Sequence, residues 1–388
     1  MIHTIAPQSV FHAKWDAHNR HLNLEPPTLW EKVGRVVWNI LSVLIPVILV
    51  IRAIGWYVAY LSKKATLPSV HLSVEKLQKI RDLFNAYCDG PITDENRAFR
   101  QSYTVERHTV VTPDKVPLAT LYFKHKKSTA DTPTIIYYQP NMAISELAVH
   151  SWLFKEAIRT NTPINLVAFD YRDVYLSKNP QVTSEYFQRP EDLILDGEAI
   201  FQFVRDQLHV PAEQIRTYGW SLGGCISANV KALHQECTAP YVNERSFSST
   251  ADVIRSYLKD HPFLRCFLFW FPCAIEAMKW NLVTPIARVS GKPLIVYHPR
   301  DSTIKQAASC YELAVQTRRR GFDAIRLEGQ NVLQLAEIMG FNMYHHATPL
   351  DQYRAEYGTG VPRSFSAVEE IAKYLFAPVQ PAQIAINA

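Results

Sequence analysis

Glycine is scarce in this chain. Only 13 of its 388 residues are glycine, whereas average usage of about 7% would give roughly 27. A phosphate-binding loop needs several closely spaced glycines, and neither G-x-G-x-x-G nor G-x-x-x-x-G-K-[ST] occurs in the sequence. The shortage therefore argues against dinucleotide-binding and P-loop proteins.

Paired cysteines and long charged runs are missing as well. The six cysteines form no C-x-x-C pair and have no zinc-ligand spacing, and neither H-E-x-x-H nor an EF-hand loop occurs. We therefore expect no metal, no cofactor and a reducing compartment. The net charge is only +5, and the basic clusters at residues 124–127 and 318–320 are short solvated faces. No nucleic-acid partner is expected.

An apolar segment lies near the N-terminus. Residues 36–51 carry no charge, Arg52 interrupts, and residues 53–61 continue apolar. Spanning a bilayer takes roughly 20 residues, a length that residues 36–61 reach only with Arg52 inside and with Pro46 kinking the helix. We predict membrane association through residues 36–61. A kinked helix or hairpin in one leaflet fits at least as well as a single span, and a helix packed on the protein is the alternative.

Strand-like and helical patterns alternate from about residue 100. This alternation predicts an α/β domain with a mostly parallel sheet covered by helices on both faces. Its ligands would bind at the carboxyl ends of the strands. The expected strands are residues 102–111, 116–124, 134–138, 164–169, 215–218, 241–247, 293–297 and 324–327. The expected helices are residues 146–159, 191–208, 223–234 and 367–376.

The sequence suggests three parts. Residues 1–65 form a tail with the apolar helical segment, residues 66–99 a helical linker, and residues 100–388 the α/β domain. The two expected strands that end near residue 247 and begin near residue 293 are separated by an insertion at about residues 251–290. Its run Phe-Leu-Phe-Trp-Phe-Pro-Cys-Ala-Ile, residues 267–275, is either a helix packed on the core or a wall of an acyl-chain pocket.

A nucleophile candidate stands where an expected strand gives way to an expected helix. Gly-Trp-Ser-Leu-Gly-Gly, residues 219–224, contains G-x-S-x-G in this context. Glycines two positions either side of Ser221 remove the Cβ atoms that would collide in such a tight turn. The helix that follows points its N-terminus at the site, so the N–H of Leu222 becomes one oxyanion donor. The alternative is a chance match in an ordinary turn.

The chain resembles the α/β-hydrolase superfamily from about residue 100 to 378. Phe-Asp-Tyr-Arg at residues 169–172 and the segment 215–224 are similar to recurring motifs of that superfamily. Asn-Glu-Arg-Ser-Phe-Ser-Ser at residues 243–249, with the apolar N-terminal segment, resembles more narrowly the Chlamydia 43-kDa protein family and related Legionella secreted effectors. The resemblance implies an α/β-hydrolase fold with a lid, a serine esterase, and secretion into a host cell.

The resemblance also implies the other catalytic residues. In the superfamily the serine is followed along the chain by an acid and then a histidine. It places the acid at Asp301, with Asp252 as the rival after the preceding strand. His345 and His346 are the only histidines after Asp301. The family's histidine stands three residues before Pro-Leu, which matches His346, and His345 is the alternative.

The second oxyanion donor is expected from the loop after residues 134–138. Relatives carry His-Gly-X there, whereas this chain has Gln139-Pro140-Asn141, so alignment assigns the N–H of Asn141. We therefore predict a serine hydrolase that acts on a small-molecule or lipid ester with an apolar acyl chain, through an acyl-enzyme on Ser221. An acyl thioesterase and a non-catalytic protein that binds a lipid or a partner are the alternatives.

Overall fold

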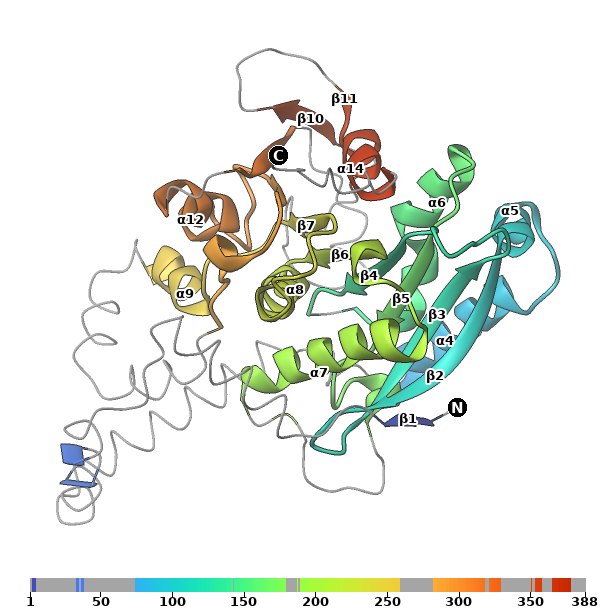
Figure 1. Cartoon of the computed structure of the whole chain (residues 1–388), viewed down its shortest axis with the longest axis horizontal. Helices are drawn as coiled ribbons and strands as arrows, with labels where there is room; N and C mark the ends of the chain where they lie inside the picture. The colour runs from blue at the N-terminus through green and yellow to red at the C-terminus, as the bar shows by residue number, and fades with distance from the viewer. Residues whose placement is uncertain are drawn as a thin grey trace, which may run out of the picture.

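The centre of the molecule is an 11-stranded sheet (Figure 1). The computed structural model describes residues 2–4, 33–34, 36–37, 74–141, 143–178, 187, 189–258, 282–317, 321–328, 350, 353–357 and 365–377. The strand order is β1-β2-β3-β5-β4-β6-β7-β8-β9-β10-β11. The strands are β1 (Ile2–Thr4), β2 (Tyr103–Val111), β3 (Pro117–His125), β4 (Thr134–Tyr138), β5 (Asn165–Phe169), β6 (Ile215–Trp220), β7 (Tyr241–Glu244), β8 (Leu294–Tyr297), β9 (Asp323–Glu328), β10 (Arg354–Tyr357) and β11 (Phe365–Ser366).

The central part of the sheet is parallel. Strands β5, β4, β6, β7, β8 and β9 run in the same direction, while β2–β3, β3–β5, β9–β10 and β10–β11 pair antiparallel. Parallel strands need crossover connections, and the helices between them supply these. The mostly parallel sheet with helices on both faces confirms the expected α/β-hydrolase fold.

Helices cover both faces of the sheet. Helices α7 (Glu191–Gln202), α8 (Leu222–Leu233) and α12 (Cys310–Gln316) contribute to the clusters on one face. Helices α4 (Val74–Cys88), α5 (Asp94–Ser102), α6 (Trp152–Arg159) and α14 (Ala367–Phe376) contribute to the cluster on the other. Helix α9 (Thr250–Leu258) follows β7.

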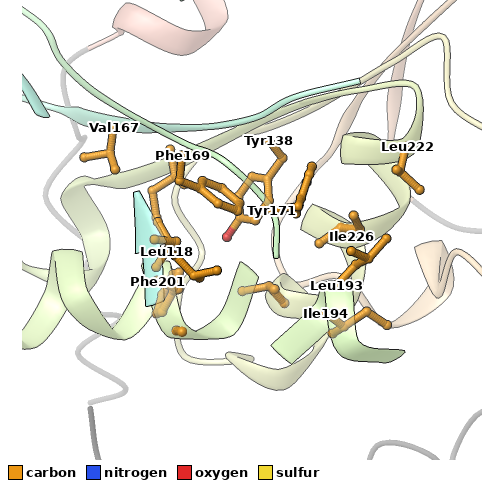
Figure 2. Close-up of a cluster of buried hydrophobic side chains, with 14 of the residues drawn as sticks. Leu118, Tyr138, Val167, Phe169, Tyr171, Leu193, Ile194, Phe201, Leu222 and Ile226 are labelled. Carbon is orange, nitrogen blue, oxygen red and sulfur yellow. The ribbon is translucent and has the colours of Figure 1, made fainter. Parts of the chain in front are cut away.

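Strand β4 illustrates why the sheet is buried on both sides. Alternate side chains point to opposite faces of a strand. Tyr138 packs with side chains of α7 and α8 (Figure 2), and Ile136 belongs to the same cluster. Ile135 and Tyr137 pack on the face covered by α6 and α14. Each buried side chain of this size contributes about 1.5–3 kcal/mol. A continuous apolar run is therefore the correct pattern for this strand.

Several expected elements are shorter than predicted, and one helix and one strand show why. The expected helix over residues 146–159 is a 3₁₀ helix at Ser145–His150 followed by α6, because Ser151 between them is extended, with ψ 143. The hydroxyl of Ser151 accepts the N–H of Leu153 at 3.3 Å and starts α6. The strand expected over residues 241–247 ends at Glu244, because Arg245 has φ 44.

Three strands were not predicted. Strand β1 pairs parallel with β2 although its residues were assigned to the tail, and β10 and β11 extend the other edge of the sheet. Apart from Val36 and Val37, the apolar segment 36–61 lies outside the described residues, as do residues 259–281 of the expected lid. Within the described part, no helix has both the length and the apolar character to cross a membrane.

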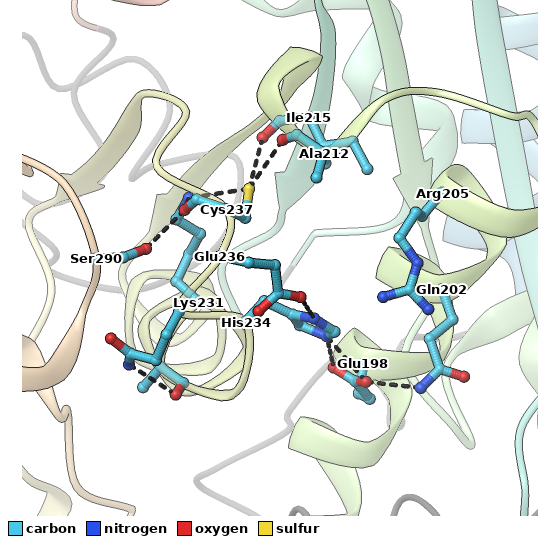
Figure 3. Close-up of polar contacts among 12 residues, drawn as sticks. Glu198, Gln202, Arg205, Ala212, Ile215, Lys231, His234, Glu236, Cys237 and Ser290 are labelled. Carbon is cyan, nitrogen blue, oxygen red and sulfur yellow. Dashed lines mark hydrogen bonds and ion pairs between the residues drawn. The ribbon is translucent and has the colours of Figure 1, made fainter. Parts of the chain in front are cut away.

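Polar groups in and beside α8 are paired with one another (Figure 3). Nε2 of His234 lies 2.8 Å from Oε2 of Glu198 on α7, and its Nδ1 lies 3.0 Å from Oε1 of Glu236. The ammonium of Lys231 donates to the carbonyl of Cys237. These contacts fix α8 against α7 and against the chain that leads to β7. The helix that begins next to Ser221 is thereby held at its far end.

Candidate active site

Ser221 occupies a strained turn between β6 and α8. Its backbone has φ 54 and ψ −118, a conformation that costs a residue other than glycine about 1–3 kcal/mol. The N–H of Ser221 donates to the carbonyl of Glu244, at the end of β7, at 2.8 Å. The turn lies at the carboxyl end of the parallel strands, which is where the sequence predicted the serine.

Three glycines make this turn possible. A Cβ atom on Gly219 would lie 2.3 Å from Oγ of Ser227, and one on Gly223 would lie 1.9 Å from the carbonyl oxygen of Tyr138. A Cβ on Gly224 would lie 2.5 Å from Cβ of Ser246. Cβ atoms in folded proteins do not come this close to other atoms, so larger residues would force the turn and its neighbours apart.

Gly223→Ala should damage the site. The new methyl group would collide with the backbone of β4, which cannot move away without disturbing the sheet, so we expect a loss of about 1–3 kcal/mol in unfolding free energy. Displacement of the candidate catalytic groups by about 1 Å should lower the expected ester hydrolysis by about 100-fold. Urea unfolding and kcat measure the two effects. Gly34→Ala, which meets nothing within 4 Å, is the control. A Gly223→Ala protein with wild-type stability and kcat would contradict this account.

The loop after β4 lies beside the first turn of α8. The Tyr138 carbonyl, at the end of β4, lies against Gly223 in the first turn of α8. Asn141 comes three residues after Tyr138, and Leu222 comes directly before Gly223. Nε2 of Gln139 donates to the carbonyl of Phe169 at 2.8 Å and secures the loop to β5. The two predicted oxyanion donors therefore come from adjacent segments.

Asp170 also holds this loop. It follows β5, and its Oδ1 accepts the N–H of Ser145 at 2.6 Å, while its carbonyl accepts the hydroxyl of Ser177 at 2.8 Å. Burial, helped by the nearby charge of Glu146, raises the pKa of the Asp170 carboxyl to about 7, although the hydrogen bonds from Ser145 act to lower it. The aspartate of the Phe-Asp-Tyr-Arg motif thus connects β5 to the segment that follows the loop after β4.

Stability should depend on pH through Asp170. Between its ordinary pKa of 3.8 and its folded value of about 7, only the folded chain binds the proton, so unfolding free energy falls as pH rises through this window. Asp170→Asn keeps an oxygen for the Ser145 N–H and removes the ionisation. Between about pH 5 and pH 8, the wild type should lose about 2–3 kcal/mol more than the variant in urea unfolding. Parallel pH profiles for the two proteins would show that the prediction is wrong.

Asp301 is held rigidly after β8. Its N–H donates to the carbonyl of His298 at 3.1 Å, and its Oδ1 accepts the N–H groups of Thr303 and Ile304 at 2.8 and 2.7 Å. The side chain is buried. In the sheet β8 is separated from β6 only by β7, so the carboxylate and Ser221 share the same edge of the sheet.

Asp252, the rival acid, accepts hydrogen bonds at the start of α9. Its Oδ2 accepts the hydroxyls of Ser248 and Ser249, each at 2.8 Å, and its Oδ1 accepts the guanidinium of Arg255 at 2.9 Å. Burial acts to raise the pKa of Asp252, but these donors outweigh burial and the pKa is lowered. The carboxylate closes the first turn of α9, an arrangement that favours Asp301 as the acid.

The two candidate histidines, His345 and His346, lie outside the described residues. On their C-terminal side Leu350 and residues 353–357 are described. Leu350 and Tyr353 are buried in the cluster on the α6 and α14 face, and the ring of Tyr353 lies 5.3 Å from the ring of His298. Tyr353 therefore packs beside the turn that carries Asp301.

Glu244 and Arg245 lie against the turn of Ser221, and the sequence reasoning assigned neither residue a role at the site. Both side chains are buried, they pair with each other, and the Glu244 carbonyl accepts the N–H of Ser221. One feature of the sequence could have pointed to them, namely two opposite charges side by side at the end of an expected buried strand. Among the described residues, no group of three potential ligands is placed to hold a metal ion.

Comparison with known proteins gives a family and a set of similar folds. A family model described as Chlamydia CHLPS protein (DUF818) matches residues 5–259. No curated protein matches the chain. An acetyl xylan esterase from Paenibacillus sp. R4 is 13% identical, with 69% of this chain and 98% of that chain covered and a TM-score of 0.44. An α/β-hydrolase from Vibrio vulnificus is 12% identical, with 66% and 86% covered and a TM-score of 0.44. An esterase from Pyrococcus furiosus is 15% identical, with 61% and 84% covered and a TM-score of 0.42.

Proposed function

The chain belongs to the Chlamydia CHLPS protein family, and we propose that it is a serine hydrolase that cleaves a carboxylic ester through an acyl-enzyme on Ser221. The backbone of Ser221 is the observation that carries the proposal. A strained, non-glycine residue between a strand and a helix, enclosed by Gly219, Gly223 and Gly224, is expensive unless the turn has a function. A serine that served only packing would not require this conformation.

The first half of the proposed reaction forms the acyl-enzyme. His346 takes the proton from Oγ of Ser221 as the oxygen attacks the ester carbonyl, and Asp301 holds the imidazole in the required tautomer. The oxyanion that develops accepts hydrogen bonds from the N–H groups of Leu222 and Asn141. Collapse of the tetrahedral intermediate breaks the ester bond, and the leaving alkoxide takes the proton from His346.

The second half releases the acid. A water molecule gives a proton to the same imidazole and attacks the acyl carbonyl, and the carboxylic acid departs when the proton returns to Oγ of Ser221. The backbone N–H donors stabilise the second oxyanion as they do the first. The helix N-terminus at Leu222 adds its positive end to the same position.

We assign an apolar acyl chain to the substrate. The support is the composition of residues 267–275, in the insertion between β7 and β8, and of the N-terminal segment 36–61. Both stretches are too apolar for an exposed surface. A small-molecule or lipid ester at a membrane surface suits both, and membrane attachment through residues 36–61 is part of the proposal.

A fluorophosphonate probe and a panel of p-nitrophenyl esters test the function on the full chain in mild detergent. We expect covalent labelling of the wild type and hydrolysis that improves as the acyl chain lengthens. An acyl-CoA series run in parallel separates an esterase from a thioesterase acting through the same serine. If the wild type is neither labelled nor active on any ester or thioester, the catalytic proposal fails and a non-catalytic hydrolase-fold protein remains.

A further inference from the structure

The motif Asn-Glu-Arg-Ser-Phe-Ser-Ser at residues 243–249 has no part in the proposed chemistry, yet its charged pair sits against the site. Glu244 and Arg245 are almost fully buried, and Nε of Arg245 donates to Oε1 of Glu244 at 2.8 Å. The hydroxyl of Tyr218 donates to Oε2 of Glu244 and accepts the indole N–H of Trp152 at 3.1 Å. A buried charge needs such partners, so this pair is part of a connected polar cluster.

The cluster touches the segment that carries Ser221. The carbonyl of Glu244 accepts the N–H of Ser221 at 2.8 Å, and the guanidinium of Arg245 lies 5.0 Å from the ring centre of Trp220. Trp220 is the residue immediately before the serine. An arginine over an indole face is attracted to it, and the attraction strengthens when water is excluded.

The same arginine reaches the segment that carries Asp301. Its backbone N–H donates at 2.7 Å to the carbonyl of Val296 in β8, the strand that leads to Asp301. Its guanidinium lies 5.8 Å from the ring centre of Tyr353, and that ring lies 5.3 Å from the ring of His298, three residues before Asp301. The side chain and backbone of Arg245 thus contact the residue before Ser221, the strand that leads to Asp301 and a ring packed beside the turn of Asp301. The turn at Arg245 has φ 44, so this placement is obtained against backbone strain.

We propose that Arg245 is a positioning residue that holds the turn of Ser221 in register with the turn of Asp301. This inference rests on the proposed serine hydrolase function and adds a residue to it. Lysine cannot replace arginine here, because it lacks the planar group that both pairs with Glu244 and lies against the two aromatic rings. The residue acts through the triad and does not touch the substrate.

The test compares Arg245→Lys with Arg216→Lys. Arg216 is also a buried arginine. It lies near the start of β6, at the end of the strand away from Ser221, and donates to the carbonyls of Leu375 and Ala377. Both variants lose a buried guanidinium, so both should melt at a lower temperature. Only Arg245→Lys should lower kcat, by about 10- to 100-fold, with KM within about twofold of the wild type. Rates are measured well below the melting temperature of each protein.

A second variant keeps the test decisive if Arg245→Lys does not fold. Tyr353→Leu retains the Glu244–Arg245 pair and removes the ring that lies between Arg245 and His298 in the turn of Asp301, and it should also lower kcat without changing KM. The inference is overturned if the wild type is active and these variants have wild-type kcat, or a kcat reduced no more than that of Arg216→Lys. A wild type that neither reacts with the probe nor hydrolyses esters would instead remove the proposed function itself.

Discussion

Ser221→Ala should reduce ester hydrolysis at least about a thousandfold and abolish labelling by a fluorophosphonate probe, because the variant has no nucleophilic oxygen at the turn. Its stability should hardly change. The hydrogen bond from the backbone N–H of residue 221 to the Glu244 carbonyl remains, and alanine adds no atom to a site where a serine already fits. Steady-state rates, probe labelling and urea unfolding measure the three expectations on the same preparation.

Ser290→Ala is the matched control. The hydroxyl of Ser290 donates to the carbonyl of Cys237 at 2.6 Å in the loop before β8, at the edge of the sheet opposite Ser221. This variant should be labelled and active like the wild type. Labelling that persists in Ser221→Ala would identify another serine as the nucleophile and refute the role given to Ser221.

Asp301→Asn should lower kcat by about 10³- to 10⁴-fold. Asparagine can still accept the N–H groups of Thr303 and Ile304, so the turn should survive. An amide presented to the imidazole stabilises the wrong tautomer and cannot support the imidazolium that forms during the reaction. The loss should therefore lie in kcat, with little change in unfolding free energy.

Asp252→Asn is the informative partner of that experiment. It weakens the acceptor for Ser248, Ser249 and Arg255 at the start of α9, and should cost about 0.5–2 kcal/mol of stability with kcat within about threefold. The two aspartates thus predict opposite signatures, one in rate and one in stability. If Asp252→Asn were the inactive variant and Asp301→Asn the active one, the acid would have to be reassigned to Asp252.

Local sequence patterns predicted two elements to the residue. Strand β4 and helix α14 have the expected bounds, because an uninterrupted apolar run and a regular helical pattern each determine their structure without distant partners. The strand-to-helix turn at Ser221 was predicted for the same reason. Its glycines, the strand before it and the helix after it all lie within about 20 residues of chain.

Features that depend on distant partners were missed. Strand β1 is defined by its pairing with β2 about 100 residues later, and β10 by its pairing with β9 across the segment of the two histidines. Arg245 is important because of Trp220 on one side and Tyr353 on the other, contacts that no local pattern contains. Its positive φ also ended β7 three residues earlier than its composition predicted.

Because Gly223 packs against the Tyr138 carbonyl, the turn of Ser221 can form only after the central strands have paired. The turn at Ser221 is strained on its own and is held only when β4, β6 and β7 lie side by side, and these strands are distant in sequence. A chain with its helices formed but its parallel strands unpaired would carry an ordinary, unreactive serine. The rate of probe labelling during refolding would therefore report the completion of the central sheet, which overall helix content cannot do.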